Sequence, residues 1–285
     1  MNGRQRIRAI ARRGRQLVAC NALAMLAVGR TTAEAQTPAP ALGDQSSVVG
    51  GGLRMVTSTS KTAALSASPV LLVVLHGDSP FGNPDYQNRF AARAAAANTD
   101  VVAVALLRPG YTDPQSHTSD GVRGITNGDN YNAVNTDAIA DAISELKRLW
   151  HARKVVVAGH SGGAAIAANI LGRHPELIDA ALLVSCPCDV ERWREHMYQQ
   201  RHANVFKGHI DTLSPIDLVA GISDRATVAM LVGSADDVAP PAISIAYQAK
   251  AASLGKHVTL VQVAGKPHDM FLESDVFAAL AGMLK

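Results

Sequence analysis

The chain has 285 residues, of which 47% are hydrophobic and 18% are charged. This balance is typical of a globular protein and not of a disordered one. No apolar run reaches the roughly 18 residues that a membrane span needs. The formal net charge is +3, and much of the basic excess lies at the start of the chain.

Residues 1–35 have the order of parts that is typical of a secretory signal peptide. Six arginines precede residue 16, a mostly apolar block spans 17–28, and Ala33-Glu34-Ala35 matches the small-residue pattern of a cleavage site. We therefore expect cleavage after about Ala35 and export to the periplasm or the medium. A basic N-terminal arm that is not removed is the alternative.

The predicted leader also explains the charge of the chain. Without it, the chain keeps 20 of its 27 basic residues and 23 of its 24 acidic residues, which gives a net charge of −3. Nothing in the remaining sequence then indicates a surface for nucleic acid.

The next segment, residues 36–60, is predicted to be an N-terminal tail with a possible first strand. Residues 36–45 are rich in proline, alanine and threonine, and 50–60 fit an antiparallel strand or hairpin. No second linker follows, so residues 61–285 are expected to form one domain.

Apolar runs alternate with helical patterns along this domain. Continuous apolar runs are typical of parallel strands that are covered on both faces. Alternation with helices indicates right-handed crossovers and an α/β fold, with a mostly parallel central sheet between two layers of helices. The expected strands are 70–76, 101–107, 154–159, 181–185, 227–233 and 257–263; the expected helices are 87–98, 137–150 (capped by Thr136 or Asp137), 162–173, 242–254 and 271–284.

Two segments depart from this alternation. Residues 108–131 form a polar stretch too long for a simple connection. Residues 188–226 are a cap-like insertion with helical patches at 190–201 and 215–221. Both follow the carboxyl ends of predicted strands, where open α/β sheets bind their ligands.

Two cysteines remain after the leader, Cys186 and Cys188. We favour two unbridged small residues at a strand end, because a disulfide across one intervening residue closes a very small ring. A disulfide formed after export is the alternative. Two cysteines alone do not make a metal site, and no metal-ligand spacing appears elsewhere.

The sequence Gly159-His160-Ser161-Gly162-Gly163 stands where a predicted strand meets a predicted helix. The G-x-S-x-G pattern at such a junction is typical of a nucleophilic serine on a sharp turn. Glycines two residues before and after the serine avoid a steric clash in that turn. A tight turn with an idle serine is the alternative.

A nucleophilic serine needs a base, and the base needs an orienting carboxylate. His268 follows the last predicted strand, so its loop reaches the same sheet edge as Ser161. Asp236 and Asp237 follow the preceding strand, and only one of two adjacent side chains can face the histidine. The predicted catalytic residues are therefore Ser161, His268 and one of these aspartates.

The segments VVLHGDSP, GHSGG, GSADDVAPP and GKPHDMF together resemble the α/β-hydrolase superfamily, from about residue 66 to the C-terminus. Bacterial esterase-like and prolyl-oligopeptidase-like domains are the most similar members. The resemblance implies Asp236 as the acid, with Asp237 as the alternative. It also implies an oxyanion hole from the N–H groups of Gly162 and Asp78, with Ser79 as the alternative to Asp78. The Asp78 carboxylate would oppose an oxyanion, so we expect it to turn away or to pair, for example with Arg108.

Substrate contacts are less specific in the sequence. Trp193 and Met197 in the insertion fit an acyl or aromatic pocket, and they fit equally the inner face of a small helical cap. Arg108 could bind a substrate carboxylate. Internal salt bridges that hold the long loop in shape are the favoured alternative for Arg108.

These features together predict an exported serine hydrolase that cleaves small-molecule carboxylic esters through an acyl-enzyme, without a metal or other cofactor. A serine peptidase or amidase with the same residues is the second hypothesis. Peptidases of the prolyl-oligopeptidase type carry a large N-terminal propeller. The short segment between the predicted cleavage site and the first predicted core strand cannot form one, which argues against that type. A non-catalytic binding module on a hydrolase fold is the third, but no member of the predicted triad is missing.

Overall fold

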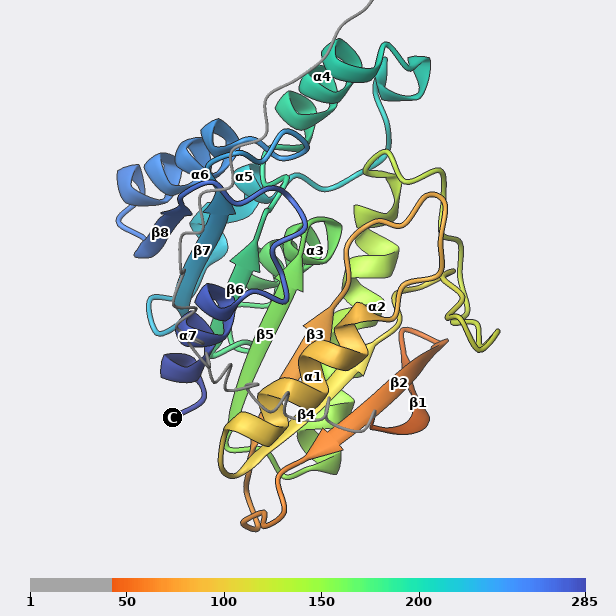
Figure 1. Ribbon diagram of the computed structural model, residues 1–285, viewed down its shortest axis with the longest axis vertical. Coiled ribbons are helices and arrows are strands. Elements are labelled where there is room, and N and C mark those ends of the chain that lie inside the picture. Colours follow the sequence, from red (N-terminus) through yellow and green to blue (C-terminus); the bar gives the residue numbers. More distant parts are fainter. Residues whose placement is uncertain (1–42) are drawn as a thin grey trace, which may run out of the picture. The chain divides into compact units, whose positions relative to one another are not determined.

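The computed structural model describes residues 43–285, so the predicted leader and residues 36–42 of the predicted tail lie outside the described residues. One eight-stranded sheet runs through this part, in the order β1-β2-β4-β3-β5-β6-β7-β8 (Figure 1). Its strands are β1 (Asp44–Gly50), β2 (Leu53–Lys61), β3 (Val70–Leu75), β4 (Val101–Leu106), β5 (Lys154–His160), β6 (Ala180–Val184), β7 (Thr227–Gly233) and β8 (Val258–Val263).

The six predicted apolar strands are confirmed as β3 to β8, and all of them are parallel to their neighbours within this group. The expected first strand is one half of a hairpin: β1 and β2 are antiparallel and meet at Gly51-Gly52. Both glycines have positive φ, of 55° and 80°, a backbone region that two-residue hairpin turns require and glycine tolerates. β2 then pairs antiparallel with β4.

Helices cover both faces of the sheet, as expected. One face carries α1 (Tyr86–Ala97) and α7 (Ser274–Met283), and the other carries α2 (Ala133–Leu149), α3 (Gly162–Arg173) and α6 (Pro241–Ser253). Successive side chains of a strand point to opposite faces. In β3, for example, Leu71 and Val73 pack under the α2–α3 layer while Leu72 and Val74 pack under the α1–α7 layer. This double burial explains why β3 is apolar throughout.

Two helix starts differ from the prediction by more than one residue. α2 begins at Ala133 rather than 137, and its N-cap is Asn132, whose side chain accepts a hydrogen bond from the Asn135 N–H at 3.0 Å. The apolar spacing starts only at Ile139 and therefore hides the first turn. α7 begins at Ser274 rather than 271, because Phe271 lies in the preceding turn and packs into the core.

The insertion contains α4 (Val190–Arg201), η2 (Asn204–Phe206), α5 (Pro215–Leu218) and η3 (Val219–Gly221). α4 lies beyond the carboxyl ends of the parallel strands (Figure 1). The buried Arg194 ties α4 to the long loop, because its guanidinium donates to the carbonyl oxygen of Asn127 at 2.6 Å; it also donates to Gly208, within the insertion, at 3.2 Å. The long loop itself ends in η1 (Asp129–Tyr131).

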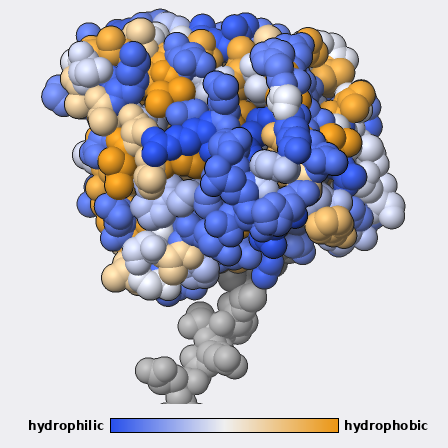
Figure 2. Space-filling view, turned by 90° about the horizontal axis from the view of Figure 1, so that it is seen from above, coloured by the Kyte–Doolittle hydropathy of each residue, from blue (hydrophilic) through white to orange (hydrophobic). Residues whose placement is uncertain are grey.

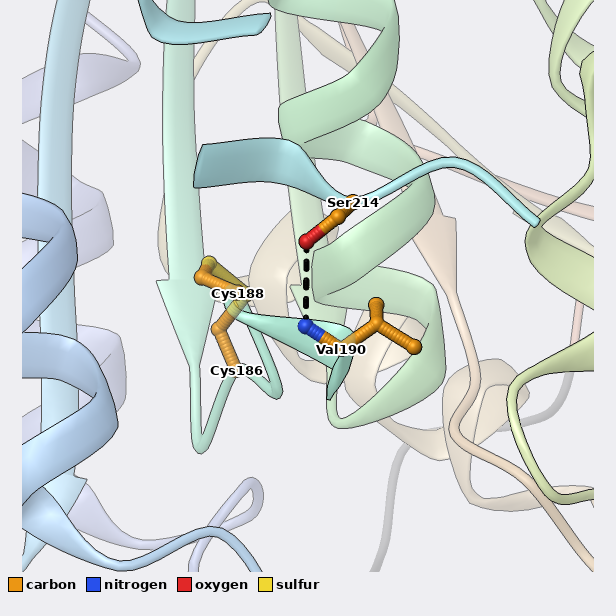
Figure 3. The surroundings of a disulfide bond; sticks show 4 residues. All are labelled: Cys186, Cys188, Val190 and Ser214. Carbon is orange, nitrogen blue, oxygen red and sulfur yellow. Dashed lines mark hydrogen bonds between the residues drawn. A yellow bond between two sulfur atoms is a disulfide. The ribbon is translucent and has the colours of Figure 1, made fainter. Parts of the chain in front are cut away.

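Cys186 and Cys188 are joined by a disulfide at the start of this insertion (Figure 3). The preference for two unbridged cysteines was therefore wrong. Their Cα atoms are 5.1 Å apart, within the usual range for a disulfide. The next residues begin α4, where the Val190 N–H donates to the Ser214 hydroxyl at 3.0 Å.

Seen from the α4 end of the molecule, the surface is mostly hydrophilic, with hydrophobic residues in small groups (Figure 2). No helix within residues 43–285 is long and apolar enough to cross a membrane. The same residues contain no cluster of three or more metal-ligating side chains.

Candidate active site

Ser161 sits on a sharp turn between β5 and α3. Its φ of 50° is positive, a backbone conformation that non-glycine residues adopt rarely and at a cost in energy. The turn places Ser161 at the N-terminus of α3, where free backbone N–H groups favour negative charge.

The glycines of the motif are required by close packing around this turn. A Cβ added to Gly159 would lie 2.5 Å from the carbonyl oxygen of Gly163, and one added to Gly163 would lie 2.5 Å from that of His76. Both distances are far below a normal contact. The backbone around Ser161 is therefore as crowded as the sequence pattern predicted.

His268 and Asp236 lie together on the loops after β8 and β7. The Nδ1 atom of His268 is 2.9 Å and 3.0 Å from the two carboxylate oxygens of Asp236. A carboxylate only accepts hydrogen bonds, so the proton of the neutral ring lies on Nδ1. The other ring nitrogen, Nε2, is then free to accept a proton.

Asp236 is held in place from behind by the backbone. Its Oδ1 accepts hydrogen bonds from the N–H groups of Val238 at 3.0 Å and Ala239 at 2.8 Å. Burial alone would raise the pKa of Asp236, but the hydrogen bonds from His268 and Ala239 outweigh it and lower the pKa below the ordinary value. Asp236 is thus an ionised, fixed acceptor for the imidazole.

Asp237, the alternative acid, is exposed. Its backbone carbonyl accepts a hydrogen bond from Nε2 of His196 at 2.7 Å. Within residues 43–285, no hydrogen bond joins the Asp237 carboxylate to His268. The geometry therefore favours Asp236 as the partner of the imidazole.

His160 contacts His268 and is the sequence neighbour of Ser161. The rings of His160 and His268 have centroids 5.0 Å apart, and His160 directly precedes Ser161. The hydrogen bonds of the described part of the chain do not include one between the Ser161 hydroxyl and His268. Catalytic hydrogen bonds are often long in free enzymes and shorten when substrate binds.

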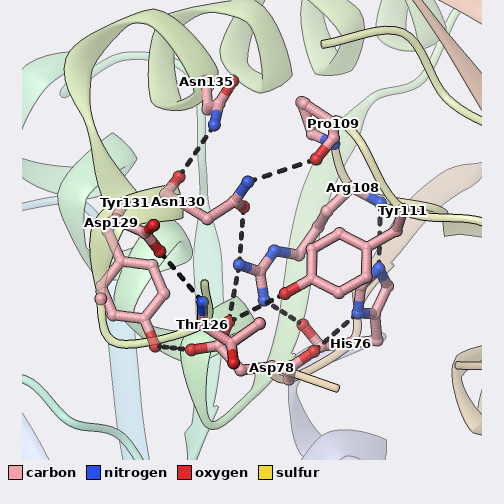
Figure 4. A network of polar contacts seen from close by, with 12 residues as sticks. His76, Asp78, Arg108, Pro109, Tyr111, Thr126, Asp129, Asn130, Tyr131 and Asn135 are labelled. Atoms are coloured by element: carbon pink, nitrogen blue, oxygen red, sulfur yellow. Dashed lines mark hydrogen bonds and ion pairs between the residues drawn. The ribbon is translucent and has the colours of Figure 1, made fainter. Parts of the chain in front are cut away.

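The Asp78 carboxylate lies against Gly162 rather than away from it. A Cβ added to Gly162 would be 2.6 Å from Oδ1 of Asp78 and 2.7 Å from the hydroxyl oxygen of Tyr131. Asp78 is nevertheless paired: it accepts from the Arg108 guanidinium at 2.9 Å and from the hydroxyl of Tyr131 at 2.6 Å (Figure 4). Of the two expected arrangements, pairing with Arg108 is the one observed.

Arg108 is fully buried in this cluster. Its guanidinium also donates to the His76 carbonyl at 3.0 Å and to Oδ1 of Asn130 at 2.7 Å (Figure 4). Burial acts to lower the pKa of Arg108, but the negative charge of Asp78 and two neighbouring tyrosines raise it above the ordinary value. Arg108 has no exposed surface and is paired with Asp78, so the structure supports the favoured reading, an internal salt bridge, and gives no support to a contact with a substrate carboxylate.

Trp193 and Met197 form the inner face of α4. Both are buried in the main core, and Trp193 packs edge-on against Phe206 with ring centroids 5.7 Å apart. This is the second of the two arrangements that the sequence allowed, a helical cap packed on the sheet. A hollow of about 900 Å³ lies beside α4, lined by residues such as Tyr198, Lys207 and Asp217, and its lining includes none of Ser161, Asp236 or His268.

Sequence reasoning missed several polar residues of this site. Tyr86 contacts His160, Tyr131 contacts Asp78, and Ser185 donates to the His268 carbonyl at 3.2 Å. His76 is the histidine of the segment VVLHGDSP, and its packing against this site could not be read from the sequence. Burial, followed by the charge of Arg108, lowers the pKa of His76 well below its ordinary value, so the ring is neutral. Only His160 carried a usable signal, as the variable residue of the G-x-S-x-G motif.

Solved structures similar to this chain are esterases and peptidases. They include the esterase Est1E from Butyrivibrio proteoclasticus with ferulic acid bound (TM-score 0.61, 16% identity, covering 84% of this chain and 97% of that one). Proline iminopeptidase from Mycobacterium smegmatis has a TM-score of 0.63 and 15% identity, covering 85% and 97%. Acylaminoacyl peptidase from Pyrococcus horikoshii has a TM-score of 0.61 and 16% identity, covering 82% and 39%, so this chain spans about two fifths of that protein's length.

At such low identity these likenesses show a shared fold. A search of curated proteins gave no match. The profile of the family described as "Alpha/beta hydrolase family", in contrast, matches residues 72–217, about half of the chain and the part that contains β3, the elbow and α4. The chain belongs to the alpha/beta hydrolase family.

Proposed function

We propose that this protein is an exported serine hydrolase that cleaves carboxylic esters through an acyl-enzyme, with Ser161, His268 and Asp236 as its triad. The observation that carries the proposal is the contact of one ring nitrogen of His268, Nδ1, with both carboxylate oxygens of the buried Asp236. It lies on the loops after β7 and β8, which leave the same edge of the sheet as the elbow of Ser161.

The reaction follows from these positions. Ser161 attacks the ester carbonyl carbon while Nε2 of His268 takes the hydroxyl proton, and the resulting imidazolium is stabilised by the ionised Asp236. The N–H groups of Gly162 and Asp78 would hold the oxyanion. His268 then gives its proton to the leaving alcohol, and a water molecule repeats the sequence on the acyl-enzyme to release the acid. The scheme uses only side chains and backbone groups of this chain.

The pairing of Asp78 supports its place in the oxyanion hole. A free carboxylate beside Gly162 would repel a developing negative charge. The buried guanidinium of Arg108 and the hydroxyl of Tyr131 compensate that charge, so the backbone N–H groups of this loop can act on the substrate oxygen.

The decisive test is labelling with a fluorophosphonate, which modifies activated serines. We expect the wild type to label at Ser161 and to hydrolyse p-nitrophenyl esters, and Ser161→Ala to lose labelling and at least about 10³-fold in kcat. A wild type that does not label while a control hydrolase does would support the non-catalytic binding module instead.

A peptidase or amidase activity is the second candidate, and the likeness to proline iminopeptidase and acylaminoacyl peptidase favours including it. We expect kcat/KM for acyl esters to exceed that for the matching peptide anilides by more than the intrinsic difference in their reactivity. A panel of esters from acetate to palmitate, aromatic esters and peptide anilides measures this directly. Preference for the anilides would replace the esterase proposal.

Export is part of the proposal and has an independent test. The arginine-rich leader and the disulfide between Cys186 and Cys188 both suit an oxidising compartment. We expect the protein recovered from the periplasm or medium to begin near Gln36, which N-terminal sequencing would show. An uncleaved N-terminus on exported protein would contradict the predicted cleavage site.

A further inference from the structure

A chain of hydrogen bonds connects the segments around Ser161. The backbone N–H of Gly77, in the loop after β3, donates to the hydroxyl oxygen of Tyr86. That hydroxyl lies 2.8 Å from Nδ1 of His160, and Nε2 of His160 lies 3.0 Å from the carbonyl oxygen of His268. Tyr86 is the first residue of α1, so four separate segments take part.

The donors and acceptors in this chain can be assigned from the groups at its two ends. The carbonyl of His268 can only accept, so Nε2 of His160 carries a proton. Burial, followed by the nearby His268, lowers the pKa of His160 to about 3, so near neutral pH its ring has only that one proton. Nδ1 of His160 is therefore an acceptor, and the hydroxyl of Tyr86 donates a hydrogen bond to it.

The chain spans the two loops that the reaction needs on either side of the serine. Gly77 directly precedes Asp78, whose N–H is the proposed oxyanion donor, and the far end is the backbone of the proposed base itself. A Cβ added to Gly77 would lie 2.9 Å from the Ser161 Cβ and 3.0 Å from the Tyr86 hydroxyl oxygen. The Ser161 side chain thus packs directly against Gly77, the residue at which this series of hydrogen bonds begins.

We propose that Tyr86 and His160 are positioning residues that hold the oxyanion loop and the His268 loop in register with Ser161. This inference rests on the proposed function of Ser161 and His268. Neither side chain takes part in bond making: both act through the backbone of Gly77 and of His268.

The expected loss of kcat on removing the Tyr86 hydroxyl follows from the two polar groups that this hydroxyl pairs with. Its removal leaves the Gly77 N–H and the His160 Nδ1 without their partner, and buried polar groups without partners favour local rearrangement. A displacement of about 1 Å at a reacting group can lower the rate on the order of 10²-fold. When the Tyr86 hydroxyl is removed, the His268 carbonyl still accepts a hydrogen bond from Ser185. We therefore expect the His268 loop to shift rather than to open.

The first test compares Tyr86→Phe with Tyr247→Phe. Tyr247 is a fully buried tyrosine of α6 whose hydroxyl has no hydrogen-bond partner in the described part of the chain, so its variant makes the same chemical change without breaking a bond. With kcat counted per fluorophosphonate-titrated site, we expect Tyr86→Phe to lower kcat by about 10- to 100-fold. KM is expected to stay within about twofold, and Tyr247→Phe to match the wild type. A Tyr86→Phe enzyme with wild-type kcat, or a loss that appears in KM alone, would overturn the inference.

The second test replaces His160. Glutamine has an amide oxygen that can accept from Tyr86 and an NH2 group that can donate to the His268 carbonyl, whereas leucine can do neither. We expect His160→Gln to retain at least about ten times the kcat of His160→Leu, again per titrated site. Equal kcat in the two variants would refute a positioning role. Failure of the proposed function would look different, because the wild type itself would then show no hydrolysis that depends on Ser161.

Discussion

Two carboxylates belong to the candidate active site, and the protein treats their charges differently. Asp78, beside Gly162, is paired with the buried cation of Arg108 and accepts from the hydroxyls of Tyr111 and Tyr131. Asp236 has no permanent cation among residues 43–285: it accepts from two backbone N–H groups and from His268. The first charge is neutralised at all times, and the second is left to be balanced only when His268 takes a proton.

This difference matches the work each position would do. A carboxylate next to an oxyanion must not add negative charge, so its compensation has to be permanent. A carboxylate behind a base must favour the imidazolium, so its charge has to stay available. The comparison therefore predicts that removing the charge of Asp236 affects mainly catalysis, whereas removing the cation that pairs with Asp78 affects the stability of the fold as well as catalysis.

The largest effect is expected for Asp236→Asn. The N–H groups of Val238 and Ala239 both donate to Oδ1, so an asparagine would keep its oxygen there and direct its NH2 group at Nδ1 of His268. The ring proton would then move to Nε2, which could no longer accept the Ser161 proton. We expect kcat to fall on the order of 10⁴-fold, measured with the best ester of the panel. A fall below tenfold would show that the proton position of His268 does not depend on Asp236.

The stability difference between the wild type and Asp236→Asn is expected to depend on pH. Because the folded-state pKa of Asp236 is lowered, its ionisation stabilises the fold above the pKa of the unfolded chain, near 3.9. That stabilisation is lost as the pH falls through the folded pKa. The difference in Tm between wild type and Asp236→Asn is therefore expected to shrink below about pH 4. A difference that does not depend on pH would mean that the charge of Asp236 contributes nothing to stability.

The second effect is expected for Arg108→Met, on stability. Breaking a buried ion pair by removing one partner leaves an uncompensated charge and costs about 3–5 kcal/mol in free energy of unfolding. Urea unfolding followed by fluorescence would measure it. The double variant Asp78→Asn/Arg108→Met no longer buries a charge and should regain part of the loss. A loss under about 1 kcal/mol for the single variant would mean that Asp78 needs no permanent cation.

The sequence predicted the parts of this site that follow from local pattern. The elbow is encoded within five residues, and His268 and Asp236 each follow a predicted strand that is mostly apolar. The compensation of Asp78 was harder to predict, because Tyr131 lies 53 residues away and Arg108 had two possible roles. Tyr86 gave no signal at all, since its partner His160 is 74 residues distant and tyrosine at the start of a helix is unremarkable.

The cap shows a different limit. Trp193 and Met197 are spaced by four residues on α4 and so share one face of the helix. That spacing identifies a buried face, but a face can be buried against the core or against a substrate, and the pattern is the same for both. Only the packing of Trp193 on Phe206 and Tyr131 decides between them.

The smallest effect on kcat and stability is expected for Asp237→Asn, and this variant tests whether Asp236 alone is the partner of His268. Asp236 and Asp237 are neighbours in sequence with the same chemistry, but Asp237 is exposed and its contact with His196 uses the backbone carbonyl, which the substitution keeps. Surface substitutions of this kind usually change stability by less than about 0.5 kcal/mol. We expect kcat and kcat/KM to stay within about threefold of the wild type, because water already screens the charge of Asp237. A loss for Asp237→Asn as large as that for Asp236→Asn would mean that the loop rearranges during turnover and that either carboxylate can reach the imidazole. In that case the contrast between a permanently neutralised and an available charge would hold for the resting enzyme alone.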